Sequence, residues 1–356
     1  MSSKPGKIHP NCARRVATLA QAGQKLHEML VSNRIAPYLQ RAYHANPWFT
    51  EDSTRQALER IVYHFFDQDK LHQWLRPYQQ AIAEQPPRTI GMVMAGNIPM
   101  AGLHDLISAL LCGHYVRAKL SSRDVVLMKL MVRLLAETDV EFEEKIELLE
   151  DGVLRPFDAV IATGSTNTSR YFDYYFQSYP SIIRKNRNAV AVLTGHENEA
   201  ELQRIGRDAF EYFGLGCRSV SKLMVPNDYD FRHFFEANVN WRVELMEHHK
   251  YKNNYDYLKS ILLLNGEKHL DAGYVLVRES QQTASAISSL HYQYYDDIEN
   301  VTDWLNQHQS AIQVVLTNSG QRFGALESKH FGMAQQPELW DYADGVNTLA
   351  FLTTLN

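Results

Sequence analysis

The chain has 356 residues, 45% of them hydrophobic and 22% charged, which is ordinary for a globular protein and long enough for two domains. Its 36 basic and 41 acidic residues give a net charge of −5 without a long basic run, so no nucleic-acid partner is expected. No apolar run reaches the roughly 18 residues that span a bilayer, and the first residues lack the apolar stretch of a signal peptide, so we expect a cytoplasmic protein.

The first part of the chain is predicted to be helical. Residues 13–85 are rich in Leu, Ala, Gln and Arg, and Thr50 followed by Glu51 and Asp52 is a plausible helix start after the break around Asn46–Phe49. The pair Pro86-Pro87 stops this pattern. We therefore assign residues 1–88 to a helical N-terminal region that packs on the domain that follows.

Strands and helices then alternate. Short apolar strands are predicted at 90–95, 115–119, 145–149, 158–162 and 189–193, and helices at 99–111, 121–137, 166–177 and 197–213. This rhythm is typical of a parallel sheet covered on both faces. The fold class is therefore α/β, with a first domain at 89–214.

A second α/β set follows Cys217. Strands are predicted near 221–225, 273–278, 289–294 and 312–316, and helices near 231–247, 252–264 and 298–308. We place the second domain at 215–330. The remaining residues, 331–356, are expected to return to the active-site or interface region.

Cys217 is the most informative single residue. It follows Gly214-Leu215-Gly216, where glycines allow a tight turn and a close approach to a ligand, and it precedes Arg218. A cysteine in such a place, near positive charge, can be held as a reactive thiolate. The alternative is a buried structural cysteine, since free cysteine is among the most buried residue types.

The three cysteines offer no other chemistry. Cys12, Cys112 and Cys217 have no metal-ligand spacing and make a poor disulfide framework, and the pair His248-His249 has no metal-site spacing either. No metal is expected.

Two strand-to-helix turns could meet a ligand. They are Ala95-Gly96-Asn97-Ile98-Pro99 and Ala162-Thr163-Gly164-Ser165-Thr166. Ligands of open α/β sheets gather at the carboxyl ends of strands, and helix N-termini favour phosphates. Each turn is also explained by a helix cap, and neither matches the Gly-x-Gly-x-x-Gly fingerprint.

Taken together, these segments resemble the aldehyde dehydrogenase superfamily, and within it the acyl-CoA reductase (LuxC-like) branch. The resemblance runs from about residue 90 to the C-terminus. It rests on Ala95–Pro99, Lys119–Asp124, Asp158–Ser165, Ile183–Arg187, Phe213–Arg218, Tyr292–Asp296 and Leu339–Gly345. It implies a nucleotide-binding domain at 89–214 and a catalytic domain at 215–330.

The resemblance also implies roles for single residues. Cys217 would attack an acyl thioester such as a fatty acyl-CoA, and Asn97 would donate to the resulting oxyanion. A nicotinamide cofactor would meet Lys119, Gly164 and Ser165. NAD-preferring relatives often carry an acid three residues after this lysine, whereas here Ser122 and Arg123 occupy the place. A hydroxyl and a guanidinium suit a 2′-phosphate, so NADPH is the predicted cofactor, unless Arg123 lies merely on an exposed helix face.

An absence indicates the direction of the reaction. Hydrolytic aldehyde dehydrogenases have a glutamate that activates water, and the stretch Ala189–Gly195, taken as its counterpart, carries no acid. His196 and Glu197 lie just downstream and leave open a displaced base, although acids at a helix start have an ordinary capping role. The basic cluster Arg184–Arg187 either meets coenzyme A phosphates or is a solvated loop.

The predicted function is thus NADPH-dependent reduction of an acyl-CoA to an aldehyde through an acyl-cysteine. Alternatives are an acyl-phosphate reductase or aldehyde dehydrogenase of the same superfamily, or a non-catalytic nucleotide-binding subunit of a complex. Expected partners are the acyl thioester substrate and either a second copy of the chain or a fatty-acid-activating protein.

Overall fold

The computed structural model describes residues 9–355, and the chain forms two compact units. The first unit runs to Lys185 and resumes at Pro337, and the second is Asn186–Gln336. The division differs from the boundary expected at 214/215. It lies earlier because the strand Asn188–Val192 (β6) pairs with Val220–Pro226 (β7) of the second sheet and not with the first sheet.

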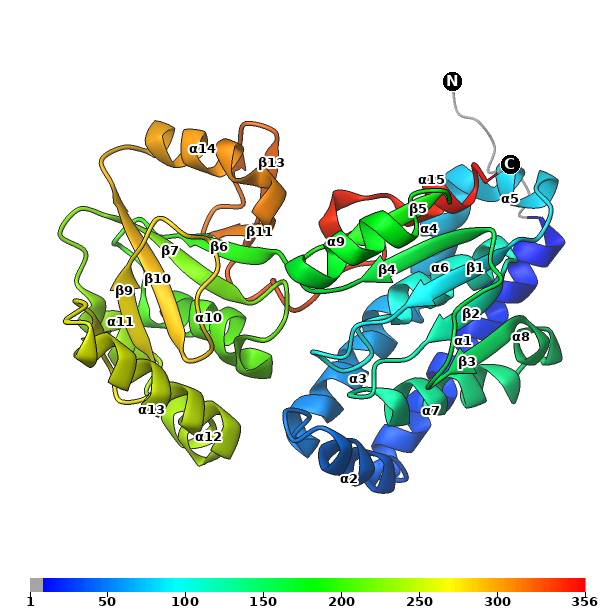
Figure 1. The fold of residues 1–356 in the computed structure, drawn as a ribbon, viewed down its shortest axis with the longest axis horizontal. Helices are drawn as coiled ribbons and strands as arrows, with labels where there is room; N and C mark the ends of the chain where they lie inside the picture. The colour runs from blue at the N-terminus through cyan, green and yellow to red at the C-terminus, as the bar shows by residue number, and fades with distance from the viewer. Residues whose placement is uncertain (1–8, 356) are drawn as a thin grey trace. The chain divides into compact units, whose positions relative to one another are not determined.

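Helices form the start of the first unit, as expected (Figure 1). They are α1 (Pro10–Val31), α2 (Ala36–Ala45), α3 (Glu51–Phe65), α4 (Gln68–Leu75) and α5 (Gln79–Glu84), with a 3₁₀ turn η1 (Arg76–Tyr78) before α5. Thr50 caps α3, because its side chain accepts a hydrogen bond from the Ser53 N–H at 3.4 Å.

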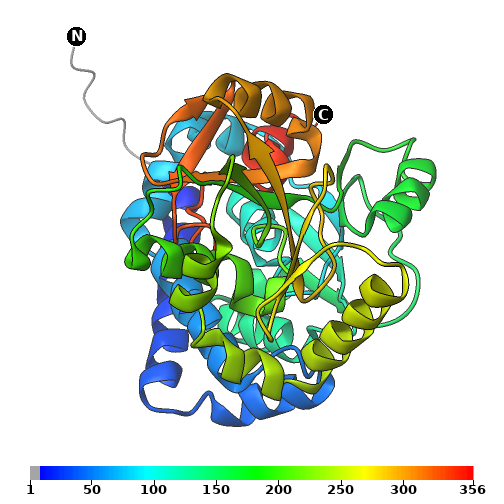
Figure 2. The same cartoon turned by 90° about the vertical axis from the view of Figure 1, so that its left-hand side faces the viewer.

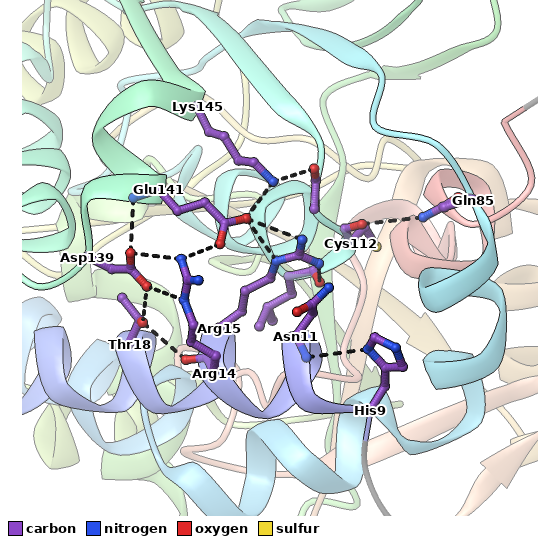
Figure 3. Close-up of polar contacts among 12 residues, drawn as sticks. His9, Asn11, Arg14, Arg15, Thr18, Gln85, Cys112, Asp139, Glu141 and Lys145 are labelled. Atoms are coloured by element: carbon purple, nitrogen blue, oxygen red, sulfur yellow. Dashed lines mark hydrogen bonds and ion pairs between the residues drawn. The ribbon is translucent and has the colours of Figure 1, made fainter.

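A polar cluster ties α1 to the short helix α8 (Val140–Lys145), as Figure 3 shows. Arg14 donates to Asp139 at 2.8 Å and to Glu141 at 2.6 Å. Lys145 lies 2.7 Å from Glu141 and donates at 2.7 Å to the Gly113 carbonyl. Because several charges share these contacts, the cluster fixes the angle of α1 better than one exposed ion pair would.

The first unit holds a five-stranded sheet in the order β3-β2-β1-β4-β5, in which every pair is parallel. The strands are β1 (Thr89–Val93), β2 (Tyr115–Lys119), β3 (Ile146–Leu149), β4 (Ala159–Thr163) and β5 (Ser181–Arg184). Between them come α6 (Leu103–Cys112), α7 (Val125–Ala136), α8 and α9 (Thr166–Tyr175). The strand β5 and the helix α8 had no counterpart in the sequence-based assignment.

Alternation along β4 shows that both faces of this sheet are covered. Ala159 and Ile161 belong to the large core that includes residues of α1, α6 and α7. Val160 and Ala162 point the other way, into a smaller cluster with Phe172 of α9. The continuous apolar strand predicted from the sequence is therefore a doubly covered parallel strand.

The second unit contains an eight-stranded sheet in the order β12-β13-β11-β6-β7-β10-β9-β8. Besides β6 and β7 its strands are β8 (Leu270–Asp271), β9 (Leu276–Glu279), β10 (Ser289–Tyr295), β11 (Ile312–Thr317), β12 (Arg322–Phe323) and β13 (Leu326–His330). Only the outer pairs β8–β9 and β12–β13 are antiparallel.

Helices of this unit are α10 (Glu199–Phe210), α11 (Phe231–Ala237), α12 (Trp241–Glu247), α13 (His249–Leu264) and α14 (Ile298–Gln307). Trp304 and Leu305 of α14 pack on Val190, Val192 and Met224 of the central strands. Figure 2 shows α14, in orange, beside the strands of this sheet.

The described C-terminal residues from Pro337 onward belong to the first unit. Glu338 accepts from Lys70 at 2.8 Å, and the Trp74 indole N–H donates to the Tyr342 hydroxyl at 2.7 Å. Leu349 of the last helix α15 (Thr348–Leu352) lies in the core with α6. This segment therefore fastens onto the N-terminal helices α3 and α4 and onto α6.

None of the helices within residues 9–355 has the length and apolar character needed to cross a bilayer. Over the same residues, no three His, Cys, Asp or Glu side chains gather in a way that could hold a metal ion.

Candidate active site

The predicted cofactor residues gather at one edge of the first sheet. In the parallel register Val93 of β1 lies opposite Lys119 of β2 and Ala162 of β4, so these three strands end at the same level. Asn97, the turn Ser122-Arg123 and the turn Gly164-Ser165 follow these ends in the chain. The sheet topology therefore brings all six predicted unit-one residues to one carboxyl edge, where ligands of such sheets bind.

The turn that bears Asn97 packs tightly on the neighbouring turn. Gly96 is buried, and a Cβ there would lie 2.4 Å from the Ser121 hydroxyl oxygen and 3.2 Å from the Arg123 Cβ. Only glycine allows this approach. Asn97 and Arg123 are thereby held on adjoining segments.

Asp124, which sequence reasoning did not single out, fixes this arrangement. Its buried carboxylate accepts a 2.6 Å hydrogen bond from the N–H of Met100, a residue in the left-handed region at φ 53°. Because Met100 is held in this non-helical conformation, α6 begins at Leu103 and not at Pro99 as predicted. Asp124 is the N-cap residue of α7, but its side chain makes no cap hydrogen bond there.

Burial raises the pKa of Asp124 well above its ordinary value, and the Met100 N–H opposes that rise. The second oxygen, Oδ1, is buried without a hydrogen-bond partner among the described residues. A neutral carboxyl group therefore suits this place better than a charged one.

Asp124→Ala is expected to destabilise the protein by about 1–3 kcal/mol, because the Met100 N–H loses its buried acceptor. Asp124→Asn keeps an acceptor oxygen in a neutral group, so its loss should be clearly smaller. Urea unfolding measures both. The matched control is Asp158→Ala, which removes an exposed carboxylate that accepts from the Thr89 N–H at 2.7 Å. Equal losses of stability for Asp124→Ala and Asp158→Ala would contradict a special role for the buried hydrogen bond between Asp124 and Met100.

The predicted cofactor residues Lys119, Ser122 and Arg123 are half-buried or exposed. Ser122 and Arg123 are exposed, and Lys119 is half-buried with its ammonium donating to the Gly152 carbonyl at 3.1 Å. Arg123 forms no ion pair with any other residue of the range 9–355. Arg123 is part of the turn at the carboxyl edge, before α7 begins at Val125.

Gly164 and Ser165 have local structural duties. A Cβ on Gly164 would lie 2.9 Å from the Phe172 ring, so glycine is required there for α9 to pack. Ser165 caps α9, because its hydroxyl oxygen accepts from the Thr168 N–H at 3.2 Å. The capping interpretation of this turn is confirmed, and contact of Ser165 with a cofactor stays a prediction.

Cys217 lies in the second unit, on the loop that enters β7. The loop begins with three successive left-handed residues: Tyr212, Phe213 and Gly214 have φ of 53°, 57° and 74°. Such conformations cost non-glycine residues about 1–3 kcal/mol each and persist where packing enforces them. Here the Phe213 ring packs on His248 with centroids 4.3 Å apart. Packing thus presets the turn that presents the half-buried Cys217.

Two further side chains hold this loop. The Ser219 hydroxyl oxygen accepts from the Gly216 N–H at 3.2 Å, and it also accepts from the Gln335 side-chain amide at 3.2 Å. Both residues are buried. Sequence reasoning missed Gln335, because 116 residues separate it from Ser219 and no local pattern links them.

The lysine that follows in the sequence is not a partner for the thiol. Lys222 is fully buried, donates to the Ser280 carbonyl at 2.6 Å and to Gln293 at 2.9 Å, and lies over the Trp304 ring. Burial lowers the pKa of Lys222 to about 8. Of the two basic residues after Cys217, only Arg218 belongs to its loop.

His196 and Glu197, the possible displaced bases, lie at the edge of the second sheet opposite to Cys217. Since β6 and β7 are parallel, Cys217 is near their amino ends, whereas His196 and Glu197 follow the carboxyl end of β6. The five residues of β6 separate the two edges by roughly 16 Å. Glu197 also accepts bonds from the Thr194 and Gly195 N–H groups, so it closes a turn.

The parallel pairing of β6 and β7 also shows that Ala189–Gly195 is not the counterpart of the hydrolytic glutamate segment. Ala189–Val192 is the buried part of β6, and the strand begins at the Cys217 edge with the half-buried Asn188. The residues of the second unit that enter β6 at that edge are Asn186, Arg187 and Asn188. This entering segment also lacks an acid.

The basic cluster 184–187 is not a solvated loop as a whole, and its contact with coenzyme A phosphates stays a prediction. Arg184 is buried and pairs with Asp105 at 2.6 Å, while it also donates to the Ala343 carbonyl. Lys185 pairs with Asp173 at 3.3 Å on the surface, and Arg187 donates to the Ile312 carbonyl. The cluster is mainly structural.

Comparison with known proteins gives a fold. No known family profile and no curated protein matches the sequence. Among solved structures the chain is similar to aldehyde dehydrogenase 21 from Physcomitrella patens in complex with succinate, with a TM-score of 0.63 and 13% identity over 86% of this chain and 73% of that one. The NAD⁺-bound aldehyde dehydrogenase of Mycobacterium tuberculosis gives 0.61 and 13%, covering 88% and 74%. That of Bacillus cereus, also with NAD⁺, gives 0.60 and 12%, covering 92% and 77%. The chain therefore has the aldehyde dehydrogenase fold, which confirms the predicted fold class.

Proposed function

We propose that this protein is an oxidoreductase that reduces an acyl thioester, such as a fatty acyl-CoA, to the aldehyde with NADPH. The observation that carries the proposal is the loop of Cys217, a half-buried thiol presented by a preset left-handed turn in a fold shared with aldehyde dehydrogenases. The LuxC-like motifs, which no comparison tests, supply the choice of acyl-CoA.

Cys217 would act as the nucleophile. Its thiolate attacks the thioester carbonyl, the carbon–sulfur bond to coenzyme A breaks, and an acyl group remains on the Sγ atom. The negative charge that develops on the carbonyl oxygen needs hydrogen-bond donors, each of which contributes roughly 3–4 kcal/mol in comparable sites. The backbone N–H of Cys217 is one candidate. A contribution from Asn97 is implied by the resemblance alone.

The segment that enters β6 at the Cys217 edge supports reduction over hydrolysis, because it carries no acid in the place of the hydrolytic glutamate. Water attacks a thioester slowly unless a base takes its proton. Asn186–Asn188 carries no carboxylate. Glu197 is close to this segment in the sequence but lies at the opposite edge of the sheet. An acyl group on Cys217 would then persist until it is reduced.

The carboxyl edge of the first sheet fits a nicotinamide cofactor. Close packing of Gly96 on Ser121 holds the turn of Asn97 at this edge, where Ser122 and Arg123 are exposed and Lys119 is half-buried. When bound, the cofactor would supply the hydride. Arg123 would select NADPH, because a guanidinium pairs with the 2′-phosphate that NADH lacks.

Arg123→Ala should weaken NADPH binding by about tenfold to 150-fold and leave NADH nearly unchanged, as expected for one lost charge-assisted contact. Fluorescence titration of both cofactors measures the ratio. Arg133→Ala, at the far end of α7, is the matched control and should change neither value. Equal losses of NADPH and NADH in Arg123→Ala would contradict the assignment of NADPH.

The direct test is to incubate the protein with NADPH and acyl-CoAs of several chain lengths and to follow nicotinamide absorbance. Cofactor oxidation with formation of aldehyde is the expected result. Consumption of aldehyde and NAD⁺ with release of free acid would instead favour an aldehyde dehydrogenase. Reduction of acyl phosphates alone would indicate an acyl-phosphate reductase, and cofactor binding without turnover would indicate a nucleotide-binding subunit.

A further inference from the structure

The six residues Phe331–Gln336, here called the strap, link β13 to Pro337 without forming a helix or strand. Two backbone N–H groups of the strap donate to one side chain of α10. Gly332 donates to Asp208 Oδ2 at 2.5 Å and Ala334 donates to Asp208 Oδ1 at 3.0 Å. One carboxylate thus holds two points of the strap.

The far end of the strap reaches the Cys217 loop. Gln335 donates its side-chain amide to the Ser219 hydroxyl oxygen at 3.2 Å, and the same oxygen accepts from the Gly216 N–H at 3.2 Å. Gly216 directly precedes Cys217. The backbone on the amino side of the cysteine is therefore linked through Ser219 and Gln335 to the strap, and through Asp208 to α10.

The side chains that make these contacts are buried, so losing one of them costs stability. Asp208 has no exposed surface, Ser219 has 2% and Gln335 has 7%. Water therefore cannot replace a lost partner at these sites. Burial raises the pKa of Asp208 to about 7, the two strap N–H groups lower it, and the neighbouring Glu211 raises it.

The backbone of the strap is also shaped for this position. Gly332 has φ 88°, in the left-handed region, and a Cβ there would lie 3.1 Å from the side chain of Arg204 on α10. Glycine at this point lets the strap lie directly on α10. A larger residue would push the strap away from Asp208.

We propose that the strap is the element that positions the Cys217 loop for acyl transfer, with Asp208 and Gln335 as positioning residues. Neither residue is assigned a contact with the reacting atoms. This inference rests on the proposed function in one respect, namely that the geometry of Cys217 limits the acyl-transfer step. The physical claim, that the strap holds residues 212–219, stands apart from that function.

The test compares Gln335→Leu and Asp208→Ala with Gln203→Leu. The control removes an exposed amide of α10, which donates at 3.0 Å to Glu199 and lies outside the strap. Backbone hydrogen exchange of the peptide covering 212–219 is measured by mass spectrometry. Release of coenzyme A from acyl-CoA in a single turnover is measured on the same samples, and Cys217 alkylation by iodoacetamide is measured as well.

In Gln335→Leu, exchange of residues 212–219 should be about tenfold faster and coenzyme A release about tenfold slower, as for one lost buried hydrogen bond. Alkylation, which needs no oxyanion donor, should not slow, and Gln203→Leu should match the wild type. Asp208→Ala should show the same changes. If that variant does not fold, Gln335→Leu alone decides the matter.

Unchanged exchange in Gln335→Leu would overturn the inference, and so would faster exchange with unchanged coenzyme A release. A wild-type protein that releases no coenzyme A would overturn the proposed function instead. In that case the exchange measurements still decide whether the strap holds the Cys217 loop.

Discussion

Cys217→Ala is expected to abolish thioester reduction, with a loss of about 10⁴-fold or more, because no other group can carry the acyl chain. Binding of NADPH should remain within about twofold of the wild type. The predicted cofactor residues belong to the first unit and Cys217 to the second, so the substitution leaves the cofactor edge untouched. Steady-state assays with acyl-CoA and a fluorescence titration of NADPH measure the two properties.

The other two cysteines supply an internal control. Cys12 and Cys112 are 1% and 3% exposed, and burial raises the pKa of both thiols, whereas Cys217 is half-buried. Iodoacetamide should therefore modify Cys217 selectively, and acyl-CoA should protect it. Substantial turnover in Cys217→Ala, or equal labelling of all three thiols, would exclude Cys217 as the covalent nucleophile.

Local patterns predicted the elements of the fold well. The apolar strand Tyr115–Lys119 and the cap at Thr50 are where the sequence places them, because periodicity and capping depend on near neighbours. The division into two units was displaced by about 30 residues. Its position depends on which sheet β6 joins, and strand pairing between distant segments leaves no mark in the sequence of β6 itself.

Some residues of the candidate site could likewise be predicted from the sequence and others could not. Lys119 ends a strand that the sequence identifies, Asn97 and Ser165 follow two others, and parallel pairing brings all three to one edge. Asp124 and Gln335 could not be found from sequence. Their importance comes from single long-range hydrogen bonds, to Met100 in one case and to Ser219 in the other.

The predicted lack of a hydrolytic glutamate near Cys217 was assigned to the wrong residues by sequence reasoning. A missing acid was predicted from the composition of Ala189–Gly195, but the first four residues of that stretch lie in the buried strand β6 and the rest follow its carboxyl end. The parallel pairing of β6 with β7 moves the relevant segment to Asn186–Asn188 and sets Glu197 at the opposite edge. We still expect no hydrolytic glutamate in this segment, but the residues concerned are now Asn186–Asn188.

An acyl adduct on Cys217 should therefore accumulate when the protein is mixed with acyl-CoA in the absence of a nicotinamide. One equivalent of coenzyme A should be released for each Cys217. General-base assistance typically speeds such steps by about 10²–10⁴-fold, so its absence should extend the lifetime of the adduct far beyond one turnover. Intact-mass spectrometry detects the added acyl mass, and Cys217→Ala should show none.

The fate of the adduct distinguishes the two directions of chemistry. Adding NADPH should discharge the acyl group as aldehyde, whereas incubation without cofactor should release little free acid. Glu197→Gln is the matched variant, since its carboxylate closes the turn at Thr194–Gly195 at the other edge of the sheet. Its adduct should be as long-lived as that of the wild type. Rapid loss of the wild-type adduct to free acid, slowed in Glu197→Gln, would identify Glu197 as a hydrolytic base and replace the reductase proposal with an aldehyde dehydrogenase.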